Sequence, residues 1–112
     1  MADKHSKQNE DVIAYTAAHA ALRVKGVGAL CNAPISFSLR SKEKYRGVVM
    51  SSDEKTYSFD LYININYGSK IPQTAFAVQE AVKKAVESIA EKEVLKVNIH
   101  VLGIDFRQLQ KA

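Results

Sequence analysis

The 112-residue sequence has one cysteine, two prolines and no tryptophan, and these shortages exclude several classes of protein. The single Cys31 cannot form an internal disulfide, so nothing indicates an oxidising compartment. The longest apolar runs have the length of a strand or are interrupted by charge, so none can span a bilayer. The first ten residues are polar and lack the apolar segment of a secretory leader. We therefore expect a cytoplasmic protein, peripheral to the inner face of the cell membrane only where a partner or a charged surface holds it there.

The residue types that carry catalysis and metal binding are equally sparse. None of His5, His19 and His100 has a cysteine, a histidine or a paired carboxylate at the spacing of a metal site. Cys31 has no activating base beside it, and no two acidic residues are spaced as a general acid and base. The sequence therefore predicts no metal, no cofactor and no enzymatic activity, and we expect His19 to be a solvated helix residue.

What the sequence does contain is the composition of one small soluble domain. Hydrophobic residues make up 46% and charged residues 25%, enough for a single two-layer core. The net charge of +4 is compatible with nucleic acid, an anionic membrane or an acidic protein, and decides among none of them.

The N-terminal half predicts a helix followed by one or two strands. Residues 1–9 are expected to be a flexible polar tail, and Asn9 can cap the helix. Its apolar stripe consists of Ile13, Ala17, Ala20, Ala21 and Val24. Gly26 can take the left-handed conformation that ends a helix. Alternation predicts a short strand at 35–40, and residues 45–50 either continue it past a bulge or form a separate strand.

The C-terminal half predicts a strand, a crossover helix and a strand. Apolar side chains alternate strictly over residues 57–67, and Pro72 suits the first turn of a helix. The helix stripe consists of Ile71, Ala75, Val78, Val82, Ala85 and Ile89. Residues 94–102 form the last strand, parallel to the previous one because crossovers are right-handed.

These elements predict an α+β fold. We expect a two-layer sandwich with a small mixed three- to four-stranded sheet and two helices on one face, in the order α-β-β-α-β. Residues 10–106 should form a single domain, with a short C-terminal tail at 107–112.

The predicted sheet face away from the helices is polar but carries little charge. It should present Asp60, Tyr62, Asn64, Asn66, Asn98 and His100. Because aromatic residues dominate the energetics of interfaces, Tyr62 is the expected anchor for a partner. Asn64, Asn98 and His100 are the other expected contacts, with a plain cross-strand role as the alternative for His100.

One basic cluster, Arg40, Lys42, Lys44 and Arg46, surrounds Tyr45. Such a loop can contact the phosphates of nucleic acid or an anionic membrane surface. It can equally be a solvated hairpin whose charges prevent edge pairing, and we favour this second interpretation.

Several phrases of the sequence resemble a known family. They are AAHAALRVKGVGAL (17–30), DLYININYG (60–68), the Ile71-Pro72 helix start and VNIHVLGIDF (97–106). Together they are similar to the alkaline shock protein family, the Gls-type envelope stress-response proteins of Gram-positive-type bacteria. The resemblance implies a non-enzymatic protein-interaction module in cell-envelope homeostasis that binds a membrane-anchored partner or self-associates into an oligomer. The alternative is a small RNA- or DNA-binding domain that uses the Arg40–Arg46 loop, although the sheet lacks paired stacking aromatics.

Overall fold

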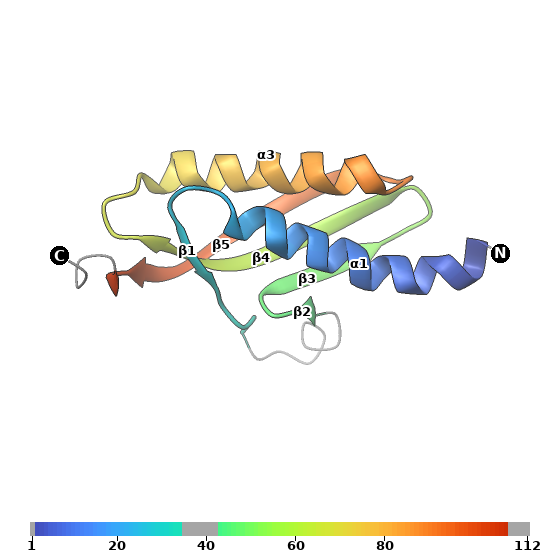
Figure 1. The fold of residues 1–112 in the computed structure, drawn as a ribbon, viewed down its shortest axis with the longest axis horizontal. Helices are drawn as coiled ribbons and strands as arrows, with labels where there is room; N and C mark the ends of the chain where they lie inside the picture. Colours follow the sequence, from blue (N-terminus) through green and yellow to red (C-terminus); the bar gives the residue numbers. More distant parts are fainter. Residues whose placement is uncertain (1, 35–42, 108–112) are drawn as a thin grey trace.

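The computed structural model describes residues 2–34 and 43–107, with side chains from Glu10 onward. These residues form two helices that lie side by side over one face of a five-stranded sheet (Figure 1). The elements are α1 (Ala2–Leu22), β1 (Val27–Leu30), β2 (Glu43–Tyr45), β3 (Val48–Ser52), β4 (Thr56–Asn66), α3 (Ile71–Ile89) and β5 (Glu93–Asp105). The predicted α+β fold with both helices on one face is confirmed.

Strand β4 lies at the centre of the sheet because both of its edges are paired. Strand β5 pairs with it in parallel along its whole length, from Thr56 opposite Glu93 to Asn66 opposite Asp105. On the other edge, β3 pairs antiparallel with the first half of β4 and β1 pairs antiparallel with the second half. Strand β2 lies outside β3. The mixed sheet and the parallel last two strands are as predicted.

The sheet has five strands, where the sequence predicts three to four, because Val27–Leu30 forms β1. These four residues show no alternation, and their local pattern indicates only the end of a helix. Pairing with β4, for example of Leu30 with Ile63, provides the hydrogen bonds that their backbone needs once it is buried. The partner lies more than thirty residues away in the chain, so local pattern cannot reveal it.

Helix α1 begins at Ala2, so the predicted start at Asn9 is wrong. Residues 2–9 contain neither glycine nor proline, and nothing in their composition stops a helix from extending toward the N-terminus. The helix ends at Leu22. In the turn that follows, Gly26 has a φ of +102°, the left-handed conformation predicted for it.

The segment 45–50 is divided between two strands. Strand β2 ends at Tyr45 and β3 begins at Val48, with a tight turn at Arg46 and Gly47 between them. Gly47 has a φ of +80°, which a residue with a side chain rarely adopts. Residues 43–52 therefore form a hairpin, whereas the strand predicted at 35–40 lies outside the described residues.

The larger hydrophobic cluster of the described residues lies between the helices and the sheet. Strand β4 contributes alternate residues, as predicted: Tyr57, Phe59, Leu61, Ile63 and Ile65. The helices contribute Ile13, Ala14, Ala17, Ala18, Ala21, Val78, Val82 and Val86. Each well-buried Val, Ile or Phe stabilises the fold by roughly 1.5–3 kcal/mol. Ile71 and Ile89, predicted to be inside, are exposed because they lie at the two ends of α3.

Candidate protein-interaction surface

The sheet face opposite the helices brings most of the predicted contact residues together. Parallel register places Tyr62 of β4 beside His100 of β5, and Asp60 beside Asn98. Asn64 lies further along β4, opposite Gly103. Facing pairs on neighbouring strands point to the same side of a sheet, so these side chains form one continuous surface. We call the group Asp60, Tyr62, Asn98 and His100 the open-face cluster.

Asp60 is the centre of the open-face cluster, although the sequence did not single it out. Its Oδ1 lies 2.9 Å from His100 Nε2 and accepts a hydrogen bond of 3.2 Å from Asn98 Nδ2. The side chains of His100 and Asp60 remain 41% and 32% exposed. The contact becomes an ion pair when the imidazole is protonated. The one feature of the sequence that could have indicated this central role is the position of Asp60, a carboxylate in the middle of an alternating strand.

Tyr62 departs from the prediction, because its side chain is almost completely buried. Only 6% of the residue is exposed. One face of its ring stacks on His100, with centroids 4.5 Å apart and planes 12° from parallel. Burial, with smaller contributions from Asp60 and Glu43, raises the pKa of the phenol. Tyr62 is therefore not exposed as the predicted anchor would need to be, and its ring instead lies against one face of the His100 ring.

The burial of Tyr62 results from a second, smaller hydrophobic cluster. Ala33 and Val49 pack with Tyr62, and the partly buried Cys31 packs against this cluster. The Cys31 N–H donates a hydrogen bond of 2.7 Å to the Tyr62 carbonyl, which holds this segment against β4. Burial raises the pKa of the Cys31 thiol, so it is protonated at neutral pH.

The side chain of Glu43 also holds the segment around Ala33 in place. Its Oε2 accepts a hydrogen bond of 3.1 Å from the Ala33 N–H and one of 2.8 Å from the Gly47 N–H. The carboxylate thus joins the chain after β1 to the turn between β2 and β3. In the sequence Glu43 lies within a basic run, where its role was not apparent.

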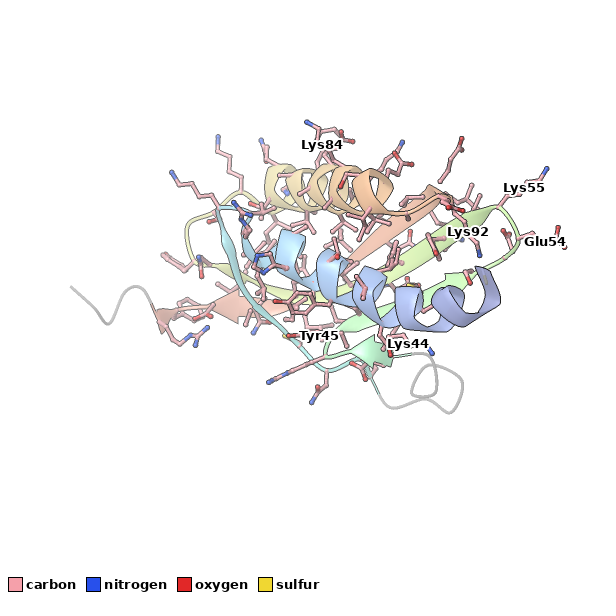
Figure 2. The ribbon with its side chains drawn as sticks, turned by 45° about the vertical axis from the view of Figure 1, so that its right-hand side comes forward. Lys44, Tyr45, Glu54, Lys55, Lys84 and Lys92 are labelled. Atoms are coloured by element: carbon pink, nitrogen blue, oxygen red, sulfur yellow. The ribbon has the colours of Figure 1, made fainter. Side chains whose placement is uncertain are left out.

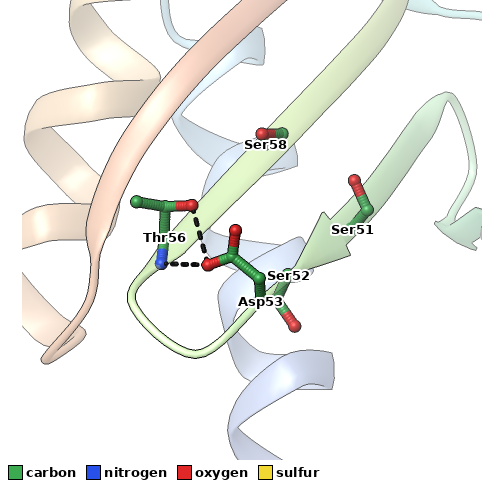
Figure 3. A pocket seen from close by; sticks show the side chains of 5 residues that line it. All are labelled: Ser51, Ser52, Asp53, Thr56 and Ser58. Carbon is green, nitrogen blue, oxygen red and sulfur yellow. Dashed lines mark hydrogen bonds between the residues drawn. The ribbon is translucent and has the colours of Figure 1, made fainter.

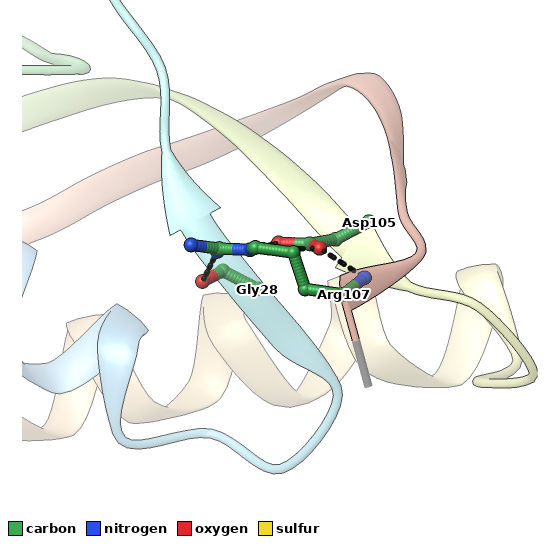
Figure 4. Close-up of polar contacts among 3 residues, drawn as sticks. All are labelled: Gly28, Asp105 and Arg107. Carbon is green, nitrogen blue, oxygen red and sulfur yellow. Dashed lines mark hydrogen bonds and ion pairs between the residues drawn. The ribbon is translucent and has the colours of Figure 1, made fainter. Parts of the chain in front are cut away.

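The end of β5 is secured by an arginine from the predicted C-terminal tail. Arg107 Nε lies 3.0 Å from both carboxylate oxygens of Asp105, and its guanidinium also donates to the Gly28 carbonyl of β1 (Figure 4). Asp105 is buried, whereas the Arg107 side chain is 69% exposed. The side-chain hydrogen bonds from Arg107, followed by its backbone N–H, lower the pKa of Asp105.

Because the pKa of Asp105 is lower in the folded chain than its usual value of about 3.8, this contact should be sensitive to acid. It contributes its full stability above that value and loses it as the pH falls through the folded pKa. We expect Arg107→Ala to reduce the free energy of unfolding at about pH 7, and the difference from wild type to shrink at about pH 3. Urea denaturation of both proteins at the two pH values measures this. A difference that stays constant with pH would show that the carboxylate of Asp105 is not involved.

The described members of the basic cluster, Lys44 and Arg46, lie at the opposite edge of the sheet from β5, on β2 and the turn after it. Lys44 and Arg46 are exposed, and Lys44 lies 3.8 Å from Glu10 of α1, a surface ion pair worth at most about 1 kcal/mol. Figure 2 shows Lys44 and Tyr45 beside α1. Arg40 and Lys42 lie outside the described residues.

His19 is exposed, as predicted, and its ring stacks on Tyr15, which in turn meets Tyr45 edge-on.

A polar hollow of about 210 Å³ lies at the turn between β3 and β4 (Figure 3). It is lined by Ser51, Ser52, Asp53, Thr56 and Ser58. Asp53 Oδ1 accepts hydrogen bonds from the N–H groups of Lys55 and Thr56 and from the Thr56 hydroxyl, and these bonds lower its pKa. The carboxylate is therefore engaged in shaping the turn.

The described residues contain no group of three His, Cys, Asp or Glu side chains that could hold a metal ion. Neither helix, over its described length, combines the length and the apolar character needed to cross a membrane.

The class of protein defined by this arrangement is a small α+β domain with two helices on one face of a mixed sheet. Solved structures of MamM CTD share the fold. A triple variant has a TM-score of 0.55 at 15% identity, covering 88% of this chain and 99% of that chain. The nickel form of a single variant has a TM-score of 0.53 at 16% identity, covering 84% and 98%. At such identities the likeness shows the fold alone.

The chain belongs to the alkaline shock protein 23 family, described as having a cell envelope-related function, whose model matches residues 2–106. The predicted resemblance to alkaline shock proteins is thus confirmed. Streptococcus pyogenes Spy1535 is 35% identical over 86 residues, 76% of this chain and 67% of that protein. Spy1614 of the same organism and YloU of Bacillus subtilis are 34% and 31% identical over 101 residues, each match covering 86% of this chain and 84% of the relative.

Proposed function

We propose that this chain is a non-enzymatic protein-interaction module that serves the cell envelope by binding a membrane-anchored protein or its own copies. The observation that carries the proposal is the open-face cluster. Asn98 and His100 are each hydrogen-bonded to Asp60, yet all three side chains remain partly exposed, on a sheet face that the helices leave uncovered.

The chemistry of this surface favours a protein partner over nucleic acid. Its exposed groups are amides, an imidazole and a carboxylate, which exchange hydrogen bonds with another protein as readily as with water. A negative Asp60 opposes the approach of phosphates. Tyr62 is buried, so its ring is not available to stack with a base.

The preorganisation of the cluster supports the same conclusion. The stack on Tyr62 and the contact with Asp60 restrict the His100 ring, so little side-chain entropy is left to be lost when a partner binds. A membrane location for such a module would then come from its partner.

Capture from cells tests the open face. Asn98→Ala together with His100→Ala is expected to reduce recovery of the crosslinked partner about tenfold, the loss typical of central interface contacts. The matched control removes an exposed histidine and an exposed amide from the helices, His19→Ala with Gln73→Ala, and should leave recovery unchanged. Normal capture by the folded Asn98/His100 variant would rule out this face.

Cell fractionation separates the candidate partners. Sedimentation with membranes that survives a high-salt wash would support a protein anchor. Release by salt would instead point to anionic lipid and the basic cluster around Lys44 and Arg46. A wholly soluble, nuclease-sensitive complex would favour the RNA-binding alternative, in which the exposed Tyr15 and Tyr45 lie near the same basic residues.

A further inference from the structure

The outer edge of β5 faces no other strand in the described part of the chain. β5 pairs with β4 alone, and it is thirteen residues long. An edge strand presents a row of unpaired N–H and C=O groups, and natural proteins usually protect such edges with charge, proline, bulges or a covering element. The two halves of β5 differ in how their outer edge is protected.

Helix α3 protects the first half. Glu87 Oε2 accepts a hydrogen bond of 2.9 Å from the Val94 N–H, and Gln79 Nε2 donates one of 2.8 Å to the Val97 carbonyl. Two backbone groups of the edge are therefore satisfied by helix side chains. Charges at Glu93 and Lys96 add to the protection.

Apart from the register shift at Leu102, the second half, residues 98–104, lacks these features. It reads Asn-Ile-His-Val-Leu-Gly-Ile, with no Asp, Glu, Lys, Arg or Pro. Among the described residues, no α3 side chain bonds to its backbone, and exposed apolar side chains gather around it. Leu102 is 50%, Ile104 37% and Phe106 51% exposed, and the Phe106 ring lies against that of Tyr67 with centroids 5.2 Å apart.

We infer that residues 100–104 of β5, centred on Leu102, pair antiparallel with the same segment of a second copy of this chain, joining the two sheets across a twofold axis. The inference rests on the self-association branch of the proposed function and names its interface. Backbone hydrogen bonds between the edges would provide the affinity, and the exposed leucine, isoleucine and phenylalanine would be buried beside them.

Symmetry and charge favour a second copy as the occupant. In a twofold interface each residue near the axis meets its own counterpart, so any charge there would oppose itself. The segment 98–104 has no residue that is always charged, and therefore escapes this repulsion. Antiparallel pairing about Leu102 also sets the unprotected halves against each other and leaves the halves capped by Gln79 and Glu87 outside the contact.

Two leucines provide a matched pair of variants. Leu95 and Leu102 both lie at register shifts of the β4–β5 ladder, and both are exposed, at 64% and 50%. Leu102→Lys places like charges together at the axis, whereas Leu95→Lys places the same charge on the protected half. Neither should unfold the chain, which circular dichroism would verify.

Sedimentation equilibrium of the purified full chain is the first measurement. We expect wild type and Leu95→Lys to form dimers of similar affinity, and Leu102→Lys to dimerise at least about tenfold more weakly. A dimer that Leu102→Lys leaves intact would overturn the edge as the interface while leaving self-association in place. A wild-type chain that stays monomeric at high concentration would overturn the second copy as occupant. The capture experiment with Asn98 and His100 would then still test the proposed function independently.

Spin labels determine the arrangement of the strands. With Cys31→Ser as background, a label at Glu93→Cys should lie roughly 60 Å from its counterpart, since nine residues at about 3.3 Å each separate it from the axis at Leu102. A label at Leu102→Cys should lie within about 20 Å of its counterpart, because paired strands are only about 5 Å apart. A short distance at Glu93 together with a long one at Leu102 would contradict the proposed pairing.

Discussion

Tyr62→Ala is expected to lower the free energy of unfolding by about 3 kcal/mol, the cost of truncating a buried aromatic side chain. The ring is buried between Ala33, Val49 and His100, so its removal leaves a cavity and strips one face of the imidazole. Urea denaturation followed by circular dichroism measures the loss. The result matters for function, because weaker partner binding by this variant would report partial unfolding.

Tyr67→Ala is the matched control for Tyr62→Ala. Tyr67 is 58% exposed, and its replacement should cost less than about 1 kcal/mol. Equal effects of the two substitutions would show that the Tyr62 ring is accessible in solution, and would restore it as a candidate partner contact. Tyr62→Phe, which keeps the ring, should retain the stack on His100.

Gly47→Ala is expected to destabilise the chain by about 1–3 kcal/mol from backbone strain alone, with a further loss from steric contact. A Cβ at this position would lie 2.6 Å from the Cys31 carbonyl oxygen and 3.1 Å from that of Tyr62. The backbone would have to move, which would disturb the hydrogen bond of 2.9 Å from the Tyr62 N–H to the Gly47 carbonyl. The loss should appear as a lower urea midpoint with an unchanged slope.

Gly68→Ala separates the cost of backbone strain from the cost of steric contact. Gly68 also has a positive φ, +92°, but a Cβ there would meet no atom within 4 Å. Gly68→Ala should therefore cost the strain alone, and the difference between the two variants measures the close approach at Gly47. If Gly47→Ala and Gly68→Ala were equally stable, the close contact of Gly47 with the carbonyl groups of Cys31 and Tyr62 would be contradicted.

The features that could be predicted are those governed by local pattern. Strict alternation over residues 57–67 identified β4 and its buried side, and the 3.6-residue spacing with Pro72 identified α3. The handedness of crossovers then made β5 parallel to β4. Family membership followed from short phrases of sequence, above all the VNIHVLGIDF segment at 97–106.

The errors at β1 and Tyr62 concern contacts between segments that are distant in the sequence. β1 is a strand because β4 pairs with it, and Tyr62 is buried because Cys31, Ala33 and Val49 from other parts of the chain pack around it. Alternation correctly placed Tyr62 on the face opposite the helices, but it contains no information about what covers that face. For the same reason the central position of Asp60 became apparent only from the register of β4 against β5.

The sequence by itself determined the fold class, the family and the polar character of the open face, because these depend on residue type and short-range periodicity. The tertiary structure alone decided which of those polar residues are accessible and how Asp60 joins Asn98 to His100. It also decided that α3 side chains protect one half of the β5 edge and not the other. These properties depend on how strands and loops far apart in the chain are brought side by side, which no local pattern encodes.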